Sequence, residues 1–229
     1  IAILLLYKIA EKVFNKKTAI ISTLIFSLTP IFIMHTGLIL TEPLALIFGL
    51  LGVYLVLDKT KSKKVFFAGI FLSLAFLTKF TMGIFFAAIF LTILIQKEKL
   101  LAKIKELFII TIAFVIPIIP YMIFNYFRYP NMFEPFISGS WIITTATWLY
   151  GTGYTYYFTN FFFKNPLYLL FFVYIYYFFK EREWRNSNKT MFLLTSILAL
   201  IYFTFFVPRK EPRYLLIVVP FMVLAIAQS

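Results

Sequence analysis

Apolar runs of about 14–21 residues follow one another along the whole chain, separated by short charged clusters. A backbone inside a bilayer must satisfy its hydrogen bonds within each segment, which a helix of about 20 apolar residues does. Hydrophobic residues make up 62% of the 229 residues and charged residues 14%, which leaves too little polar surface to cover a soluble globule. The sequence therefore predicts an all-α, polytopic integral membrane protein, with one transmembrane domain over residues 1–229.

The runs place the expected helices along the chain, joined by one long outer loop. The helices are expected near residues 1–10, 18–35, 43–57, 65–78, 80–95, 107–127, 166–179, 190–207 and 213–227, with the loop at 128–164. The chain starts at Ile1 in what looks like the tail of a helix, so we expect a fragment that lacks at least one upstream helix. Cysteine is absent, which excludes disulfides, thiolate nucleophiles and cysteine metal sites.

Positive charge gathers in four clusters between these helices. Residues 8–17 and 58–64 each carry a net charge of +3, and residues 97–106 and 180–189 each carry +2, so the clusters hold +10 of the net +13. Cytoplasmic loops are rich in lysine and arginine, so we expect these clusters to face the cytoplasm. A basic stripe on a soluble face is missing, and nucleic acid is not an expected partner.

Residues 65–95 test this topology, because Lys79 lies near the middle of an otherwise uncharged stretch. One helix would be about 46 Å long, against a hydrocarbon core of about 30 Å, and would place residues 97–106 outside. Two short helices with a turn at residues 78–80 keep both basic flanks inside. Lys79 would then face outward and need an anion. The alternative is one tilted helix with a snorkelling lysine.

If the four basic clusters face the cytoplasm, the connections that alternate with them lie on the outer side of the membrane. These outer segments are residues 36–43, 128–164 and 208–213. Glu42 precedes Pro43 at a helix start, where the helix dipole favours a carboxylate; a functional role in positioning a metal, an acceptor or a phosphate remains open. His35, the single histidine, is expected to be structural. The loop 128–164 is rich in aromatic residues and is expected to lie in the membrane interface.

The last outer segment, residues 208–213, contains three cations. Arg209, Lys210 and Arg213 flank Glu211 and Pro212. Glu211 could cap the last helix and form a surface ion pair, which stabilises by only about 0–1 kcal/mol. That pairing would leave two cations on the side where they are disfavoured. We interpret the cations as ligands of a phosphate, whose oxygens match the donors of arginine.

The order of these motifs resembles the membrane-embedded C-class glycosyltransferases, in the branch of the protein O-mannosyltransferases and aminoarabinose transferases. LLLYKIAEKVFNKKTAIISTLIFSLTP (residues 4–30) resembles the second and third helices of that family, and LTEPL (40–44) its acidic-Pro helix start. AGIFLSLAFLTK (68–79) resembles A-G-x-x-x-G-L-A-x-x-T-K, with Ser73 in place of glycine. RKEPRYLLIVVP (209–220) resembles R-x-x-R-Y-x-x-x-x-x-P, with one extra residue between the arginines.

The resemblance implies transfer of a sugar from a polyprenyl (dolichyl-type) phosphate donor to an acceptor on the extracytoplasmic face, in a helical bundle of the cell membrane. It assigns the supporting acid to Glu42. It assigns donor-phosphate binding to cationic positions, which with their neighbours in the same segments are Lys79, Arg209, Lys210, Arg213 and Tyr214. The family's catalytic carboxylate lies in a loop that would precede Ile1, so we expect the fragment alone to be inactive.

Two other classes of protein remain as alternatives: a transporter or flippase of lipid-linked or amphipathic substrates, and a non-catalytic membrane subunit. Transporters place ionisable residues at mid-membrane in repeated halves, and neither feature is present in the sequence. A divalent metal at Glu42 stays open, because one acidic residue does not decide it. The sugar and the acceptor are not predicted.

Overall fold

The computed structural model describes residues 1–37, 40–58, 62–145 and 151–228, and in these residues all regular secondary structure is helical. The α-helices are α1 (Ala2–Val13), α2 (Lys16–Ser27), α3 (Pro30–Thr36), α4 (Thr41–Val56), α5 (Ser62–Thr78), α6 (Gly83–Ile95), α7 (Leu100–Arg128), α8 (Glu134–Thr145), α9 (Leu170–Lys180), α10 (Ser187–Ile201) and α11 (Val219–Gln228). Short 3-10 or π segments extend or join them: η1 (Phe80–Met82), η3 (Phe158–Phe162), η4 (Pro166–Leu169), η5 (Glu183–Arg185), η6 (Tyr202–Phe206) and η7 (Pro212–Ile217). The expected all-α class is confirmed.

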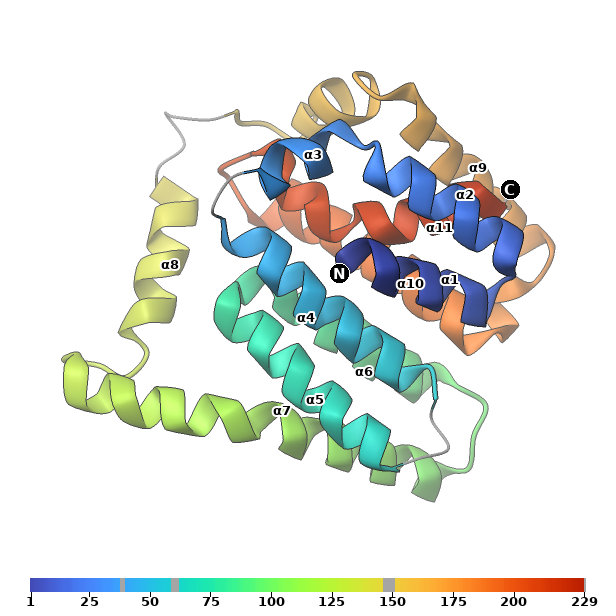
Figure 1. Cartoon of the computed structure of the whole chain (residues 1–229). Coiled ribbons are helices and arrows are strands. Elements are labelled where there is room, and N and C mark those ends of the chain that lie inside the picture. The colour runs from blue at the N-terminus through green and yellow to red at the C-terminus, as the bar shows by residue number, and fades with distance from the viewer. Residues whose placement is uncertain (38–39, 59–61, 146–150, 229) are drawn as a thin grey trace.

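The helices run back and forth between two ends of the bundle (Figure 1). α5 packs between α4 and α7, while α11 packs against α2 and α10. Gly69 allows the close approach of α5 to α7, because a Cβ atom there would lie 2.6 Å from the Ile110 carbonyl oxygen and from the Ala113 Cβ. Small residues at such contacts are typical of membrane helix pairs.

Two of the described helices are long and apolar enough to cross a membrane: α7, and α10 together with η6. α7 contains Pro117 and Pro120 and exposes most of its apolar side chains. Prolines are tolerated in membrane helices because neighbouring groups can satisfy the freed carbonyls. α4, α6, α9 and α11 are shorter apolar helices.

The turn expected at residues 78–80 is present. α5 ends at Thr78, Lys79 has an extended backbone, and η1 then leads into α6. The two-helix interpretation of residues 65–95 is therefore correct, and the alternative of one tilted helix is wrong.

Several expected helix bounds were wrong. The helix expected at 18–35 is divided into α2 and α3, because Pro30 starts a new helix and favours an extended Thr29 before it. The helix expected at 107–127 begins seven residues earlier, at Leu100, since Lys and Glu are good helix formers and a helix can continue beyond the bilayer. The helix expected at 190–207 ends in the π segment η6, and the helix expected at 213–227 begins with the 3-10 segment η7.

The expected outer loop, residues 128–164, is partly helical where it is described. It contains α8 and the π segment η3, and α8 lies at the left-hand end of the bundle in Figure 1. Gly153 has a φ of 91°, a value that favours glycine. Trp148 and Tyr150, two of the aromatic residues of this loop, lie outside the described residues.

Candidate functional site

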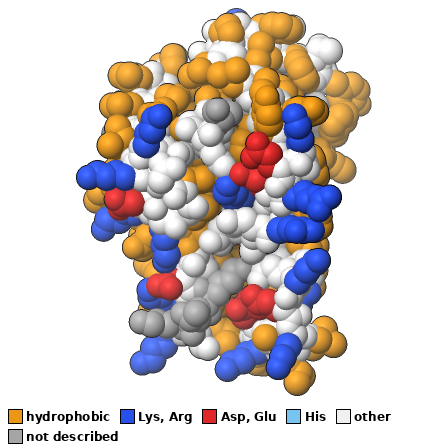
Figure 2. Space-filling view, turned by 90° about the vertical axis from the view of Figure 1, so that its right-hand side faces the viewer, with side chains coloured by type: hydrophobic (Ala, Val, Ile, Leu, Met, Phe, Trp, Pro, Cys, Tyr) orange, Lys and Arg blue, Asp and Glu red, His pale blue; other side chains and the backbone are white. Residues whose placement is uncertain are grey.

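The four lysine- and arginine-rich clusters gather at one end of the bundle, which we call the basic face. The ends of α1, α4, α6 and α9 and the starts of α2, α5, α7 and α10, which flank these clusters, lie at this end (Figure 1, right), and Figure 2 shows lysine and arginine side chains spread over that face. The start of α4, the α5–η1 turn and the η6–η7 connection lie at the opposite end. In the described residues, the basic clusters thus lie at one end of the helices, and Glu42, Lys79 and Arg209–Arg213 lie at the other. The alternation of the connections across the membrane predicted this separation.

Glu42 lies at the second of these ends, in the first turn of α4, and its side chain is 4% exposed. Its Oε1 lies 2.5 Å from the Lys79 Nζ and 3.6 Å from the Arg213 Nε. The pair with Lys79 joins residues 37 positions apart in sequence. A buried carboxylate needs such partners, so Glu42 fixes both cations at the start of α4.

Glu211 is the second buried carboxylate, with a side chain that is 5% exposed. Its Oε1 lies 2.5 Å from an Arg209 guanidinium nitrogen, and its Oε2 pairs with the Arg213 Nε. The Tyr214 hydroxyl donates to the same carboxylate at 3.1 Å. The expected pairing of Glu211 is therefore present, but inside the protein and not on its surface.

Together these five side chains form what we call the charged cluster: Lys79, Glu42, Arg213, Glu211 and Arg209, in that order of contact. The charges alternate along it and both ends are cations, so three positive groups face two negative ones. The Lys79 side chain is 17% exposed and that of Arg213 is 27% exposed. The cluster therefore has a net charge of +1 and presents its cations, more than its carboxylates, to the surroundings.

Tyr214 lies beside the exposed cations. The Lys79 Nζ is 5.2 Å and the Arg213 Cζ 5.9 Å from the centroid of its ring. Cations are attracted to the face of an aromatic ring at such distances. Tyr214 thus contacts two cations through its ring and one carboxylate through its hydroxyl group.

Lys210, which the sequence grouped with the phosphate-binding cations, does not share this arrangement. Its ammonium group donates to the carbonyl oxygens of Phe203 (2.6 Å), Thr204 (2.6 Å) and Val207 (2.5 Å). A lysine has three N–H donors, and these carbonyls occupy all of them. The side chain is buried at the end of η6, where a helix C-terminus favours a cation. Lys210 is structural.

Sequence reasoning missed the contribution of the outer segment to this end. Phe136 of α8 stacks on Phe80, next to Lys79, with ring centroids 4.4 Å apart. The Arg209 backbone N–H donates to the Ile143 carbonyl at 3.3 Å, and the Lys210 N–H to the Gly151 carbonyl at 2.9 Å. Hydrogen bonds between backbone groups do not depend on residue type, so the sequence does not predict which of them pair. The aromatic composition of the segment indicated only that it packs against apolar surroundings.

Tyr157, also unassigned from sequence, is buried against the η6–η7 connection. Its hydroxyl lies 3.4 Å from the Glu211 carbonyl oxygen, to which it donates. Burial raises the pKa of Tyr157 far above its usual range, so the phenol stays neutral and remains a donor. It holds the backbone of Glu211 from the side of the outer segment.

The other polar residues considered from sequence lie apart from the cluster. The His35 Nδ1 donates to the Ile31 carbonyl at 2.7 Å, a structural role within α3. Glu134 accepts from Ser138, and Arg128 ends α7. Within the described part of the chain, no three His, Asp or Glu side chains come together as metal ligands. A metal at Glu42 would also compete with the two cations already bound there.

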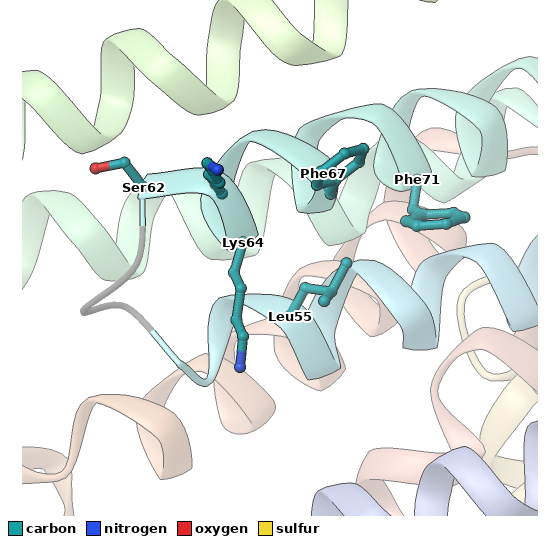
Figure 3. A pocket seen from close by; sticks show the side chains of 6 residues that line it. Leu55, Ser62, Lys64, Phe67 and Phe71 are labelled. Carbon is teal, nitrogen blue, oxygen red and sulfur yellow. The ribbon is translucent and has the colours of Figure 1, made fainter.

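A hollow of about 650 Å³ lies at the basic face between the ends of α4 and α5. It is lined by Leu55, Ser62, Lys63, Lys64, Phe67 and Phe71 (Figure 3). Figure 3 shows Lys64 extending from α5 towards α4, where its ammonium group pairs with Asp58. Leu55, Phe67 and Phe71 supply the apolar part of the lining. Lys63 is an exposed cation of the basic face and can be compared with the cations of the charged cluster.

Comparisons with known proteins place the chain in a family. Searches among curated proteins and among solved structures give no significant match. A family model, described as dolichyl-phosphate-mannose-protein mannosyltransferase, matches residues 1–124, a span that includes Glu42 and Lys79 but not Arg209–Tyr214. Because this match covers more than half of the chain, the protein belongs to the dolichyl-phosphate-mannose-protein mannosyltransferase family and is a membrane-embedded glycosyltransferase-type protein.

Proposed function

We propose that this protein transfers a sugar from a polyprenyl or dolichyl phosphate carrier to an acceptor on the extracytoplasmic side of the cell membrane, and that the charged cluster binds the carrier phosphate. The observation that carries the proposal is the net +1 charge of a cluster whose most exposed members, Lys79 and Arg213, are both cations. A phosphate is the anion that the family's donor would bring to them.

The sidedness of the proposal rests on the basic face. Its four clusters hold most of the positive charge of the chain, and such clusters face the cytoplasm. The charged cluster is at the other end of the helices, so it would face the extracytoplasmic side. The three cations at that end outnumber the two carboxylates by one, and the remaining charge favours a further anion.

The chemistry assigned to the cluster is stabilisation of the leaving group. When the sugar departs, negative charge develops on the lipid phosphate, and fixed cations in a low-dielectric site stabilise it. Arg213 presents a forked donor set suited to phosphate oxygens, and Lys79 acts as a point charge. Arg209, paired with Glu211, completes the positive end of the site.

Glu42 is assigned to positioning. Its Oε1 is occupied by cations, which makes the carboxylate a weak base. The acceptor's proton would then be taken by a different carboxylate. Glu42 and Glu211 hold the three cations in place.

The proposal is tested by measuring the dissociation constant of dolichyl phosphate for the purified protein in nanodiscs. Arg213→Gln and Lys79→Gln should each weaken binding about tenfold or more, because each removes a charged hydrogen-bond donor to the phosphate. Lys63→Gln, which removes an exposed cation at the basic face, is the matched control and should change the constant less than twofold. Equal effects of all three substitutions would refute the assignment.

A further inference from the structure

A second pocket, of about 780 Å³, opens at the basic face between the α6–α7 connection and the α9–α10 connection. The lining residues that matter here are Gln96, Lys97, Glu98, Trp184 and Arg185. It lies at the opposite end of α6 from Lys79 and shares no residue with the charged cluster. Its occupant is therefore a question separate from the donor site.

Gln96 is the feature of this pocket that points to a ligand. The residue is 9% exposed, and its side-chain Nε2 has no hydrogen-bond partner among the described residues. Buried amides in proteins are nearly always paired, since an unpaired one costs free energy. Gln96 lines the pocket, so a ligand there would lie beside a buried N–H donor in want of an acceptor.

The charges around the pocket select the sign of that ligand. Lys97 and Arg185 both line it, and Glu98 is the carboxylate among the lining residues, which leaves a net charge of +1. The Lys97 Nζ and the Arg185 Cζ lie 5.9 Å and 5.6 Å from the centroid of the Trp184 ring. Two cations on one aromatic platform, together with an amide donor, form a site for an oxyanion.

The position of the pocket indicates where the oxyanion comes from. Ile95, at the end of α6, lines the pocket and is exposed, as is Trp184. Tryptophan is enriched at the level of lipid headgroups. We propose that this pocket binds a phosphate group, and its place at the membrane interface favours the phosphate of an anionic phospholipid over a free one.

The test uses Trp184 as the reporter, in a Trp141→Phe/Trp148→Phe background in which it is the sole tryptophan. The detergent-solubilised protein is titrated with phosphatidylglycerol in one arm and with inorganic phosphate in the other, and Trp184 fluorescence is recorded. Phosphatidylglycerol should give a saturable change. Gln96→Leu should weaken the apparent affinity about tenfold, because it removes the donor while keeping the side-chain volume.

The same substitution distinguishes ligand binding from a structural role. Gln96→Leu removes an unpaired amide, so its melting temperature should be unchanged or higher, whereas a structural amide would lower it. Lys97→Gln is a second variant expected to weaken binding, and Lys17→Gln, an exposed cation on the same face, should leave it unchanged.

A response to phosphatidylglycerol alone would identify a lipid-borne phosphate, and a response to inorganic phosphate as well would show that the free anion suffices; both support the site. Absence of a saturable response in both arms, or equal affinity of Gln96→Leu, Lys97→Gln and the parent, would overturn it.

Discussion

Lysine and arginine occupy both ends of the helices, but their surroundings differ. At the basic face, Asp58 pairs with Lys12 at 3.5 Å and with Lys64, and all three side chains are about one-third exposed (34–37%). At the other end, Glu42 and Glu211 are 4–5% exposed and each contacts two cations. Exposed pairs are screened by water and fix little, whereas buried pairs fix the position of every member. Positive charge is thus held in exposed pairs at one end and in a buried, alternating cluster at the other.

The comparison also holds for single lysines. Lys79 and Lys210 both lie at the end of the bundle that holds the charged cluster. Lys79 pairs with a carboxylate, whereas Lys210 donates to backbone carbonyls. Burial alone therefore does not identify a ligand-binding cation. The partner does, because a carboxylate can share its cation with a phosphate, while three carbonyls already use all the donors of Lys210.

The largest expected effect tests the buried end. Glu211→Gln removes the carboxylate that Arg209 and Arg213 share, so that one carboxylate, Glu42, remains in the cluster beside three cations. Breaking a buried pair in this way costs about 3–5 kcal/mol. A clear fall in the melting temperature of the detergent-solubilised protein is expected.

The matched control for Glu211→Gln is Glu181→Gln, an exposed carboxylate at the basic face. It should leave the melting temperature nearly unchanged. If both substitutions have the same effect, the difference between the two ends is not one of buried against exposed charge.

A smaller effect is expected for Lys210→Met, which sharpens the distinction between the two lysines. The substitution leaves three buried carbonyls without their donor and should cost about 1–3 kcal/mol of stability. The folded protein should bind dolichyl phosphate as tightly as the parent. Lys164→Met, at an exposed site, is the control for stability; a large loss of donor affinity in Lys210→Met would return Lys210 to the phosphate site.

The smallest effect is expected for Asp58→Asn at the basic face. The hydrogen bond from Lys64, and then the charge of Lys12, hold the pKa of Asp58 below its usual range. A depressed folded-state pKa stabilises the fold above the unfolded pKa of about 3.9, and this contribution is lost as the pH falls through the folded value. The small difference in melting temperature between parent and variant should thus shrink in acid and in 1 M salt. A difference as large as that of Glu211→Gln would contradict the comparison.

The sequence predicted the helical class and the turn at Lys79 better than the contacts between distant residues. Helix length and one charge were enough to place the turn at Lys79, because both are local properties. The pair between Lys79 and Glu42 joins two distant helix ends and depends on how the helices pack. The direction of each cation in residues 209–213 depends on the local backbone, which is why the contacts of Lys210 with three backbone carbonyls were not predicted.

The role of the outer segment could not be predicted for a different reason. Its contacts with the site are a ring stack through Phe136, backbone bonds to Arg209 and Lys210, and the hydroxyl of Tyr157. Backbone groups are the same at every position, so no residue pattern indicates which of them pair. Aromatic composition predicted an interfacial location for residues that in part cover the charged cluster.

The central claim, that the cations of the charged cluster meet a lipid phosphate, is tested most directly by phosphorus NMR of dolichyl phosphate added to the purified protein in detergent without phosphate groups. The parent protein should shift or broaden the phosphate resonance saturably. Arg213→Gln should abolish most of this change, and Lys63→Gln should preserve it. An unperturbed resonance with the parent protein, or equal perturbation by Arg213→Gln and the parent, would contradict the account.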